Sequence, residues 1–261
     1  MGLLSTAALT IRFGGHIAVN AVSCTFQPGT LTAIVGPNGA GKTTYFNLIS
    51  GQLKASSGTV TLNGHDISAL PPSARTRAGL GRAFQLTNLF PHLNALENVR
   101  LAVQANAPGV HHRGLNLWSV WSDHALLTRR AEEILEVVSM HDKAASLVAS
   151  LSHGDQRKLE VAMLMALDAQ VFMFDEPTAG MSADEVPTVL NLIRKLKQDK
   201  SKTILLVEHK MDVVRELADR IIVLHNGTLV ADGEPAEVIA LPIVQEAYLG
   251  TARHDEKVPA R

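Results

Sequence analysis

Gly36-Pro37-Asn38-Gly39-Ala40-Gly41-Lys42-Thr43-Thr44 is the stretch that decides the fold, because it is a complete G-x-x-x-x-G-K-T phosphate-binding loop. The β-branched run Leu31–Val35 precedes it, and Tyr45–Ile49 has the pattern of the first turns of a helix. The glycines let backbone N–H groups point at phosphates, and the helix N-terminus adds partial positive charge there. The whole stretch is therefore predicted to bind a nucleoside triphosphate.

Two side chains of this loop carry specific chemistry. Lys42 can reach the β- and γ-phosphates, and the Thr43 hydroxyl is placed to hold Mg²⁺. The alternative is a glycine-rich turn that binds nothing, and the Lys-Thr pair between a strand and a helix argues against it. A nucleoside triphosphate and Mg²⁺ are therefore the cofactors that we expect from this loop.

The composition is that of a globular protein with a substantial core, since 46% of the 261 residues are hydrophobic and 19% are charged. The formal net charge of -1 argues against a broad nucleic-acid-binding face, so we predict no nucleic-acid partner. The single Cys24 excludes an internal disulfide and fits a reducing compartment, most simply the cytosol. We expect no signal peptide, and no apolar run approaches the roughly 20 residues of a membrane span. Any membrane role is therefore expected to act through a partner.

The order of the predicted elements indicates an interrupted α/β protein. Strand-like runs dominate the first third, the pattern turns helical from about Leu86 to Leu151, and strand-helix alternation resumes at Val171. The apolar runs Val171–Phe174 and Ile204–Val207 suit parallel strands buried on both faces. The predicted parts are an α/β core with a β subdomain at 1–85 and 155–240, a helical subdomain at 86–154, and a C-terminal tail at 241–261.

Two carboxylates follow one of these buried runs. Asp175 and Glu176 come directly after Phe174, at the carboxyl end of a predicted strand, where open parallel sheets bind ligands. Asp175 would hold Mg²⁺ through its water shell, and Glu176 would accept a hydrogen bond from the water that attacks the γ-phosphate. An acidic strand end exposed to solvent is the alternative, and these two residues alone do not exclude it.

Two further polar residues are candidates for the same site. His209 follows the run Ile204–Val207 and Glu208, so a neighbouring parallel strand would bring it to the same edge. Its imidazole could donate toward the γ-phosphate, while a surface histidine is the alternative. Gln85 stands where the sheet-like first part gives way to the helical segment, and it could sense Mg²⁺ or the water.

A second phosphate-binding device is predicted at Leu151–Gln156, which precedes an amphipathic helix. Ser152 and Asp155 have the spacing of a capping box, so an ordinary helix start is one interpretation. A helix N-terminus also binds anions, and here the Ser152 hydroxyl and the Gly154 N–H lie beside it.

Together these motifs resemble the ATP-binding-cassette ATPases in order and approximate spacing, and the match covers nearly the whole chain. The motifs that carry the resemblance are the phosphate loop, Gln85, Leu151–Gln156, Asp175-Glu176 and His209. The resemblance implies an ATPase with a P-loop NTPase (RecA-like) core of the α/β class, an antiparallel β subdomain and an inserted α-helical subdomain.

The same resemblance implies roles for several residues. Two nucleotide-binding subunits would pair head to tail, with Ser152 and Gly154 of one closing over ATP held by the loop of the other. Phe13 would stack on adenine, and Gln85 would lie in the loop that faces the membrane subunits. Lys42 and His209 would neutralise charge on the transferred phosphoryl group.

Finer features resemble the ATPase subunits of branched-chain amino acid importers. These features are Arg82–Gln85 with Leu89-Phe90, the His-Gly-Asp-Gln form of the signature, Val207–His209 and Ala247–Gly250. The implied protein lies in the cytoplasm on the inner face of the plasma (inner) membrane, and pairs with a second cassette that is either identical or different. It would contact transmembrane permease subunits and, indirectly, a solute-binding protein. Related importers of urea, amides or other solutes share much of this pattern.

Four residues depart from the general pattern, namely His153, Asp155, Ser182 and Lys210. Communication across the dimer is therefore expected to differ in detail. Leu86, Leu89, Phe90 and Leu93 are predicted to line a groove for a permease helix.

Three other classes of protein remain as alternatives. A non-transport cassette protein would usually show twin cassettes, a long coiled coil or special insertions, and none is visible in this sequence. A P-loop kinase or GTPase would lack the element Leu151–Gln156. An exporter subunit is a weaker alternative, because fusion to membrane helices is common in exporters but not universal.

Overall fold

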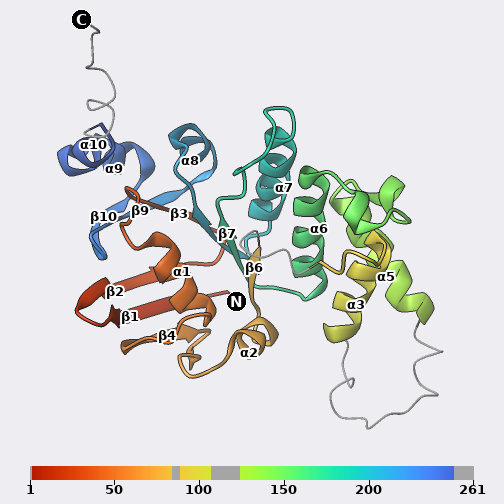
Figure 1. Ribbon diagram of the computed structural model, residues 1–261, viewed down its shortest axis with the longest axis horizontal. Helices are drawn as coiled ribbons and strands as arrows, with labels where there is room; N and C mark the ends of the chain where they lie inside the picture. Colours follow the sequence, from red (N-terminus) through yellow and green to blue (C-terminus); the bar gives the residue numbers. More distant parts are fainter. Residues whose placement is uncertain (1, 84–88, 107–123, 250–261) are drawn as a thin grey trace, which may run out of the picture.

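The computed structural model describes residues 2–83, 89–106 and 124–249, and places them in two sheets with helices around them (Figure 1). Gln85 and Leu86 lie outside the described residues.

The smaller sheet is antiparallel and has the order β2-β1-β4-β5; the larger has the order β10-β9-β3-β8-β7-β6. The strands of the smaller sheet are β1 (Leu4–Phe13), β2 (His16–Phe26), β4 (Ser57–Leu62) and β5 (His65–Asp66). Those of the larger sheet are β3 (Leu31–Val35), β6 (Leu80–Ala83), β7 (Val171–Asp175), β8 (Thr203–Val207), β9 (Arg220–His225) and β10 (Thr228–Gly233).

The larger sheet is parallel from β6 to β9, with β10 added antiparallel at its edge. Every residue of β3, β7 and β8 is buried, which explains why these strands are mostly apolar. β8 lies between β3 and β7, and Val207 is in register with both Ile34 and Asp175. The carboxyl ends of these three strands therefore meet at one edge of the sheet, as the sequence predicted.

The two faces of the larger sheet pack against different partners. Val171 and Met173 of β7 belong to a core shared with Tyr45 and Phe46 of α1 and with the antiparallel sheet. The helix α1 (Lys42–Ser50) thus packs between the two sheets, and the Tyr45 hydroxyl is hydrogen-bonded to Thr6 of β1 at 2.7 Å. Burying side chains of this size stabilises the fold by about 1.5–3 kcal/mol each.

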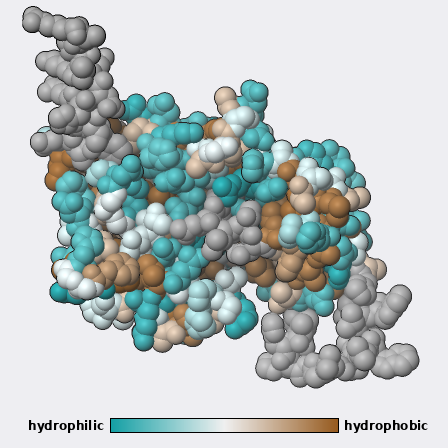
Figure 2. Space-filling view, in the orientation of Figure 1, coloured by the Kyte–Doolittle hydropathy of each residue, from teal (hydrophilic) through white to brown (hydrophobic). Residues whose placement is uncertain are grey.

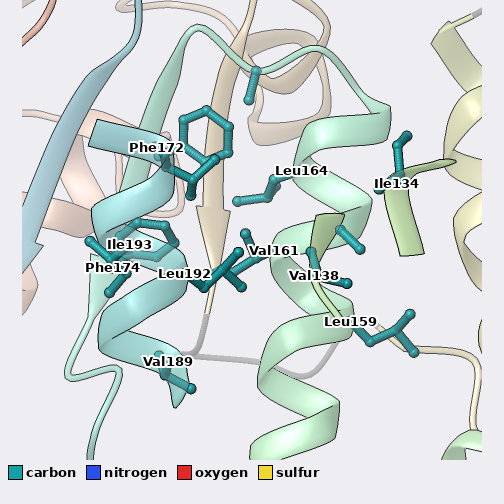
Figure 3. Packing of buried hydrophobic residues seen from close by; sticks show 14 of the residues in the cluster. Ile134, Val138, Leu159, Val161, Leu164, Phe172, Phe174, Val189, Leu192 and Ile193 are labelled. Carbon is teal, nitrogen blue, oxygen red and sulfur yellow. The ribbon is translucent and has the colours of Figure 1, made fainter. Parts of the chain in front are cut away.

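The other face of the sheet packs on helices (Figure 3). Phe172 and Phe174 of β7 contact the same core as Leu164 of α6 and Ile193 of α7. Ile134 joins α5 to this core, so the helical part and the sheet share one continuous apolar cluster. The elements of this side are α3 (Ala95–Asn106), α5 (His124–Val137), η1 (His141–Lys143), η2 (Val148–Ser150), α6 (His153–Ala166), α7 (Val186–Gln198) and α8 (Met211–Leu217).

Short helices complete the fold. α2 (Pro72–Arg77) precedes β6, and α9 (Pro235–Ala240) follows β10. The predicted tail 241–261 contains one further helix, α10 (Pro242–Leu249), whose Val244 is buried against β9 and α9. Figure 2 shows a largely hydrophilic face with apolar side chains gathered over the helical part.

Candidate functional site

The phosphate-binding loop runs from the end of β3 to the start of α1 in a shape that requires glycine. Gly36 has φ +152°, and a Cβ atom there would lie 2.1 Å from the carbonyl oxygen of Leu224. Gly41 has φ +97°, and its Cβ would lie 2.5 Å from the Ala18 carbonyl of β2. Side chains larger than glycine occur where the loop is exposed or half-buried, at Asn38, Thr43 and Thr44. The close approach of the backbone to neighbouring strands fixes the loop shape without a ligand.

Lys42 places its ammonium group inside this loop. Its Nζ donates hydrogen bonds to the carbonyl oxygens of Gly36 at 2.7 Å and Pro37 at 3.0 Å, and the residue is buried. Burial lowers the pKa of Lys42, while the nearby carboxylates Glu176 and Asp175 oppose that effect by favouring the charged form. The loop, the cation and both carboxylates therefore belong to one electrostatic site.

Asp175 ends β7 and is paired with Arg82 of β6, a partner that the sequence reasoning did not identify. The Arg82 Nη2 lies 2.6 Å from Asp175 Oδ2, and both side chains are less than a tenth exposed. Arg82 Nη1 also donates to Asn47, Ser50 and Gln52, which ties β6 to α1 and the turn after it. Burial raises the pKa of Asp175, and the charge and hydrogen bond of Arg82 partly offset this. The sequence feature that could have indicated this ion pair is the basic residue Arg82 on β6, which pairs in register with β7.

Glu176 and His209 meet at the same edge. Glu176 adopts φ +50°, and its backbone N–H donates to the carbonyl of Val207 at 2.9 Å. His209 Nδ1 lies 3.8 Å from Glu176 Oε1, and about half of each side chain is exposed. The two side chains therefore lie next to each other and open to solvent, where a ligand on the loop can reach them.

The oxygen donors at this edge fit Mg²⁺ chemically. The exposed Thr43 hydroxyl lies at the start of α1, and the Asp175 carboxylate is held in place by Arg82. Mg²⁺ keeps several waters and commonly takes one or two protein ligands beside substrate phosphates. Among the described residues no cluster of three or more His, Cys, Asp or Glu could hold a metal, so an ion here would also need phosphate and water ligands. Gln85, the third predicted metal residue, lies outside the described part of the chain.

Phe13 ends β1 at the turn of the hairpin with β2 and is about half exposed. The same hairpin lies against the phosphate loop, because Gly41 approaches Ala18 of β2. An exposed aromatic ring on this hairpin is available for stacking, and the adenine contact stays a prediction.

The start of α6 is capped by Ser152, while the Asp155 carboxylate pairs with two lysines. The Ser152 hydroxyl accepts a hydrogen bond from the Asp155 N–H at 3.2 Å, which is one half of the predicted capping box. The Asp155 carboxylate instead lies 2.5 Å from Lys143 Nζ and 3.0 Å from Lys158 Nζ. Burial alone would raise the pKa of Asp155, but the hydrogen bonds from Lys143 and Lys158 outweigh it and lower the pKa.

The Gly154 N–H at the start of α6 already binds a carboxylate of the same chain. It donates to Glu185 Oε1 at 3.2 Å, and the other Glu185 oxygen accepts from Ser182. The hydrogen bond from Gly154 is the main cause of the lowered pKa of Glu185. Figure 1 shows α6, with Ser152 and Gly154 at its start, in the helical part, and α1, which begins at the phosphate loop, between the two sheets.

The fold and the site define a P-loop nucleotide-binding ATPase of the α/β class, with its loop, acids and histidine at one edge of a parallel sheet. The ABC transporter family matches residues 19–179, and the chain belongs to this family. It is an ATP-binding and ATP-hydrolysing member, as the sequence predicted. Within the described residues, no helix combines the length and apolar character needed to cross a membrane.

Relatives and solved structures agree with this assignment. The chain is 37% identical to the high-affinity branched-chain amino acid transport ATP-binding protein LivG of Escherichia coli K12, covering 96% of this chain and 98% of LivG. It is 36% identical to the corresponding BraF of Pseudomonas aeruginosa, with the same coverage. A crystal structure of the ADP conformation of an ATP-binding cassette of an ABC transporter has a TM-score of 0.80 at 29% identity, covering 96% of this chain and 99% of that one. A dimeric cassette in a post-hydrolysis state with ADP and phosphate has a TM-score of 0.73 at 26% identity, covering 89% and 98%.

Proposed function

We propose that this chain is the ATP-hydrolysing subunit of an importer of branched-chain amino acids. The observation that carries the proposal is the meeting of the phosphate loop, Asp175, Glu176 and His209 at one sheet edge. The names of the relatives LivG and BraF support the class of solute. The cassette would supply energy, and separate permease subunits would bind and move the solute.

Each residue of the edge has a proposed role in hydrolysis. Lys42 leaves the carbonyl oxygens of its loop and neutralises phosphate charge, together with His209. Thr43 and Asp175 would hold Mg²⁺, which would offset the negative charge of the phosphates when bound. Glu176 accepts the hydrogen bond of the attacking water, and its exposed side chain leaves room for that water.

The proposed working unit is a head-to-tail pair of cassettes. Ser152 and Gly154 lie at the start of α6 in the helical part, whereas the phosphate loop begins α1 between the sheets, and in a pair they would contact the triphosphate held by the opposite subunit. The bond from Gly154 to Glu185 supports this role, because in it the Gly154 N–H donates to an anionic oxygen. The dimeric form of a structurally similar cassette agrees with such a pair.

The proposed membrane contact is a groove beside β6. It has a volume of about 180 Å³, and its lining includes Leu80, Leu89 and Met163. Phe90 follows Leu89 and is half exposed. A permease helix seated there would hold the subunit at the cytoplasmic face of the membrane, and a solute-binding protein would act on the far side.

Mixing two inactive variants tests the pair. Lys42→Ala disables the phosphate loop, and Gly154→Asp places a negative charge where the opposite triphosphate would bind. A mixed dimer keeps one intact site, so an equal mixture should recover about one quarter of the parent ATPase rate, since roughly half of random dimers are mixed. The parent rate per molecule should also rise with protein concentration. A mixture no more active than the two variants measured apart contradicts a site shared between copies of this chain.

Reconstitution tests the solute. Vesicles carrying the permease subunits should show ATPase stimulation when the solute-binding protein is loaded with leucine, isoleucine or valine. Stimulation by urea or amides, and by none of these amino acids, would assign the subunit to a related importer.

A further inference from the structure

Glu208 is a buried carboxylate that the hydrolysis scheme does not use. It follows β8, precedes His209 and has no exposed surface. Its Oε1 accepts a hydrogen bond from the Thr178 hydroxyl at 2.6 Å. Its Oε2 accepts from the backbone N–H groups of His209 at 3.0 Å and Lys210 at 3.2 Å. A buried charge is costly unless it is fully hydrogen-bonded, and these donors satisfy both oxygens.

The bonds of Glu208 join two separate loops. Thr178 lies two residues after Glu176 and is itself buried, so it belongs to the loop that follows β7. The N–H groups of His209 and Lys210 belong to the loop that follows β8. One carboxylate therefore connects the loop carrying the proposed water-binding acid to the loop carrying the histidine.

The Glu176 backbone needs such support. Its φ of +50° is uncommon for a residue with a side chain, and conformations of this kind persist only where the surroundings enforce them. The bond from Glu176 N–H to Val207 holds the start of the loop, and the bond from Ala179 N–H to the Glu176 carbonyl closes a turn around it. The bond from Thr178 to Glu208 is a buried side-chain link from this turn to the histidine loop.

We propose that Glu208 is a positioning residue that acts through Thr178 and the His209 N–H to fix Glu176 and His209 relative to each other. The inference rests on the proposed function, in which these two side chains act on the same γ-phosphate. Hydrolysis depends on this geometry, because a misplacement of about 1 Å can cost about 100-fold in rate. ATP binding depends on the phosphate loop, and within the described part of the chain no hydrogen bond of Glu208 leads to that loop.

The test compares Thr178→Val, which removes the hydroxyl at similar volume, with Thr178→Ser, which keeps it. Thr178→Val should slow single-turnover hydrolysis by about 10- to 100-fold and change the Kd of ATP by less than about threefold. Thr178→Ser should stay within about threefold of the parent. Glu208→Gln should also stay within about threefold of the parent rate, since the amide oxygen can accept from the backbone and the amide N–H can donate to Thr178.

A double-mutant cycle separates positioning from simple loss of structure. In a Glu176→Gln background, Thr178→Val should cause a much smaller further loss of rate than in the parent, because one of the two groups that it positions has already been disabled. An equal loss in both backgrounds, or a Thr178→Val variant as fast as the parent, would overturn the proposal. If Thr178→Val does not fold, Thr178→Ala replaces it with the same expectations. A Glu176→Gln variant as active as the parent would instead refute the proposed function, so the two failures are distinguishable.

Discussion

Replacing Arg82 by Met should strongly destabilise this protein, because Asp175 would then be a buried carboxylate without its cation. The two side chains are 7% and 6% exposed and their atoms lie 2.6 Å apart. Breaking a buried ion pair by removing one partner costs about 3–5 kcal/mol. For a chain of this size about 2–4 °C of Tm corresponds to each kcal/mol, so the Tm should fall by roughly 6–20 °C.

Thermal unfolding followed by circular dichroism measures this loss, and the chain offers a matched control. Arg130 forms an ion pair with Glu133 in which both side chains are at least half exposed. Arg130→Met should therefore cost at most about 1 kcal/mol. Adding Asp175→Asn to Arg82→Met should recover much of the lost stability, since neither charge then remains buried alone. An Arg82→Met variant no less stable than Arg130→Met would refute the argument that this pair is a buried charge unit.

Three other changes have defined outcomes. Asp155→Asn should lower the free energy of unfolding measured in urea, and this loss should be largest above about pH 4 and shrink as the pH falls further. The reason is that a lowered folded-state pKa contributes stability only while the carboxylate is charged. An equal loss at about pH 3 and about pH 7 would be inconsistent with this. Calorimetry should find that Lys42→Ala weakens the binding of ATP far more than the binding of adenosine, whereas Phe13→Ala weakens the binding of both ligands by roughly 1–3 kcal/mol. Equal losses of affinity for both ligands in the two variants would reject this division of roles. Phe90→Asp should abolish import into reconstituted vesicles without changing ATP affinity, and import at the parent rate would exclude this surface as the membrane contact.

The parts of the site that follow from local rules were predictable from sequence. The phosphate loop is one continuous motif, and the apolar runs that became β7 and β8 identified strands buried on both faces. Since parallel strands end at the same edge, the meeting of Asp175, Glu176 and His209 could be inferred before their distances were known. The Ser152 cap was also predictable, because cap and partner are three residues apart.

The partners that fix these groups could not be predicted in the same way. Arg82 is far from Asp175 in sequence, and the strand order alone brings them together. In the sequence, Glu208 has the pattern of an ordinary strand end, and only the structure reveals its hydrogen bond to Thr178. Glu185 reaches Gly154 across a separation of 31 residues, and only packing of the loop after β7 against α6 reveals the contact. Such contacts depend on tertiary arrangement, which periodicity and motif spacing do not encode.

Single-turnover hydrolysis at saturating ATP, with Glu176→Gln compared to the parent, tests the central claim most directly. Gln keeps the size of the side chain but cannot accept the proton of the attacking water. The variant should bind ATP with parent affinity and hydrolyse it about 10²- to 10⁴-fold more slowly, the usual range for a general base. A variant that hydrolyses ATP within about threefold of the parent rate would contradict the assignment of this sheet edge as the site of hydrolysis.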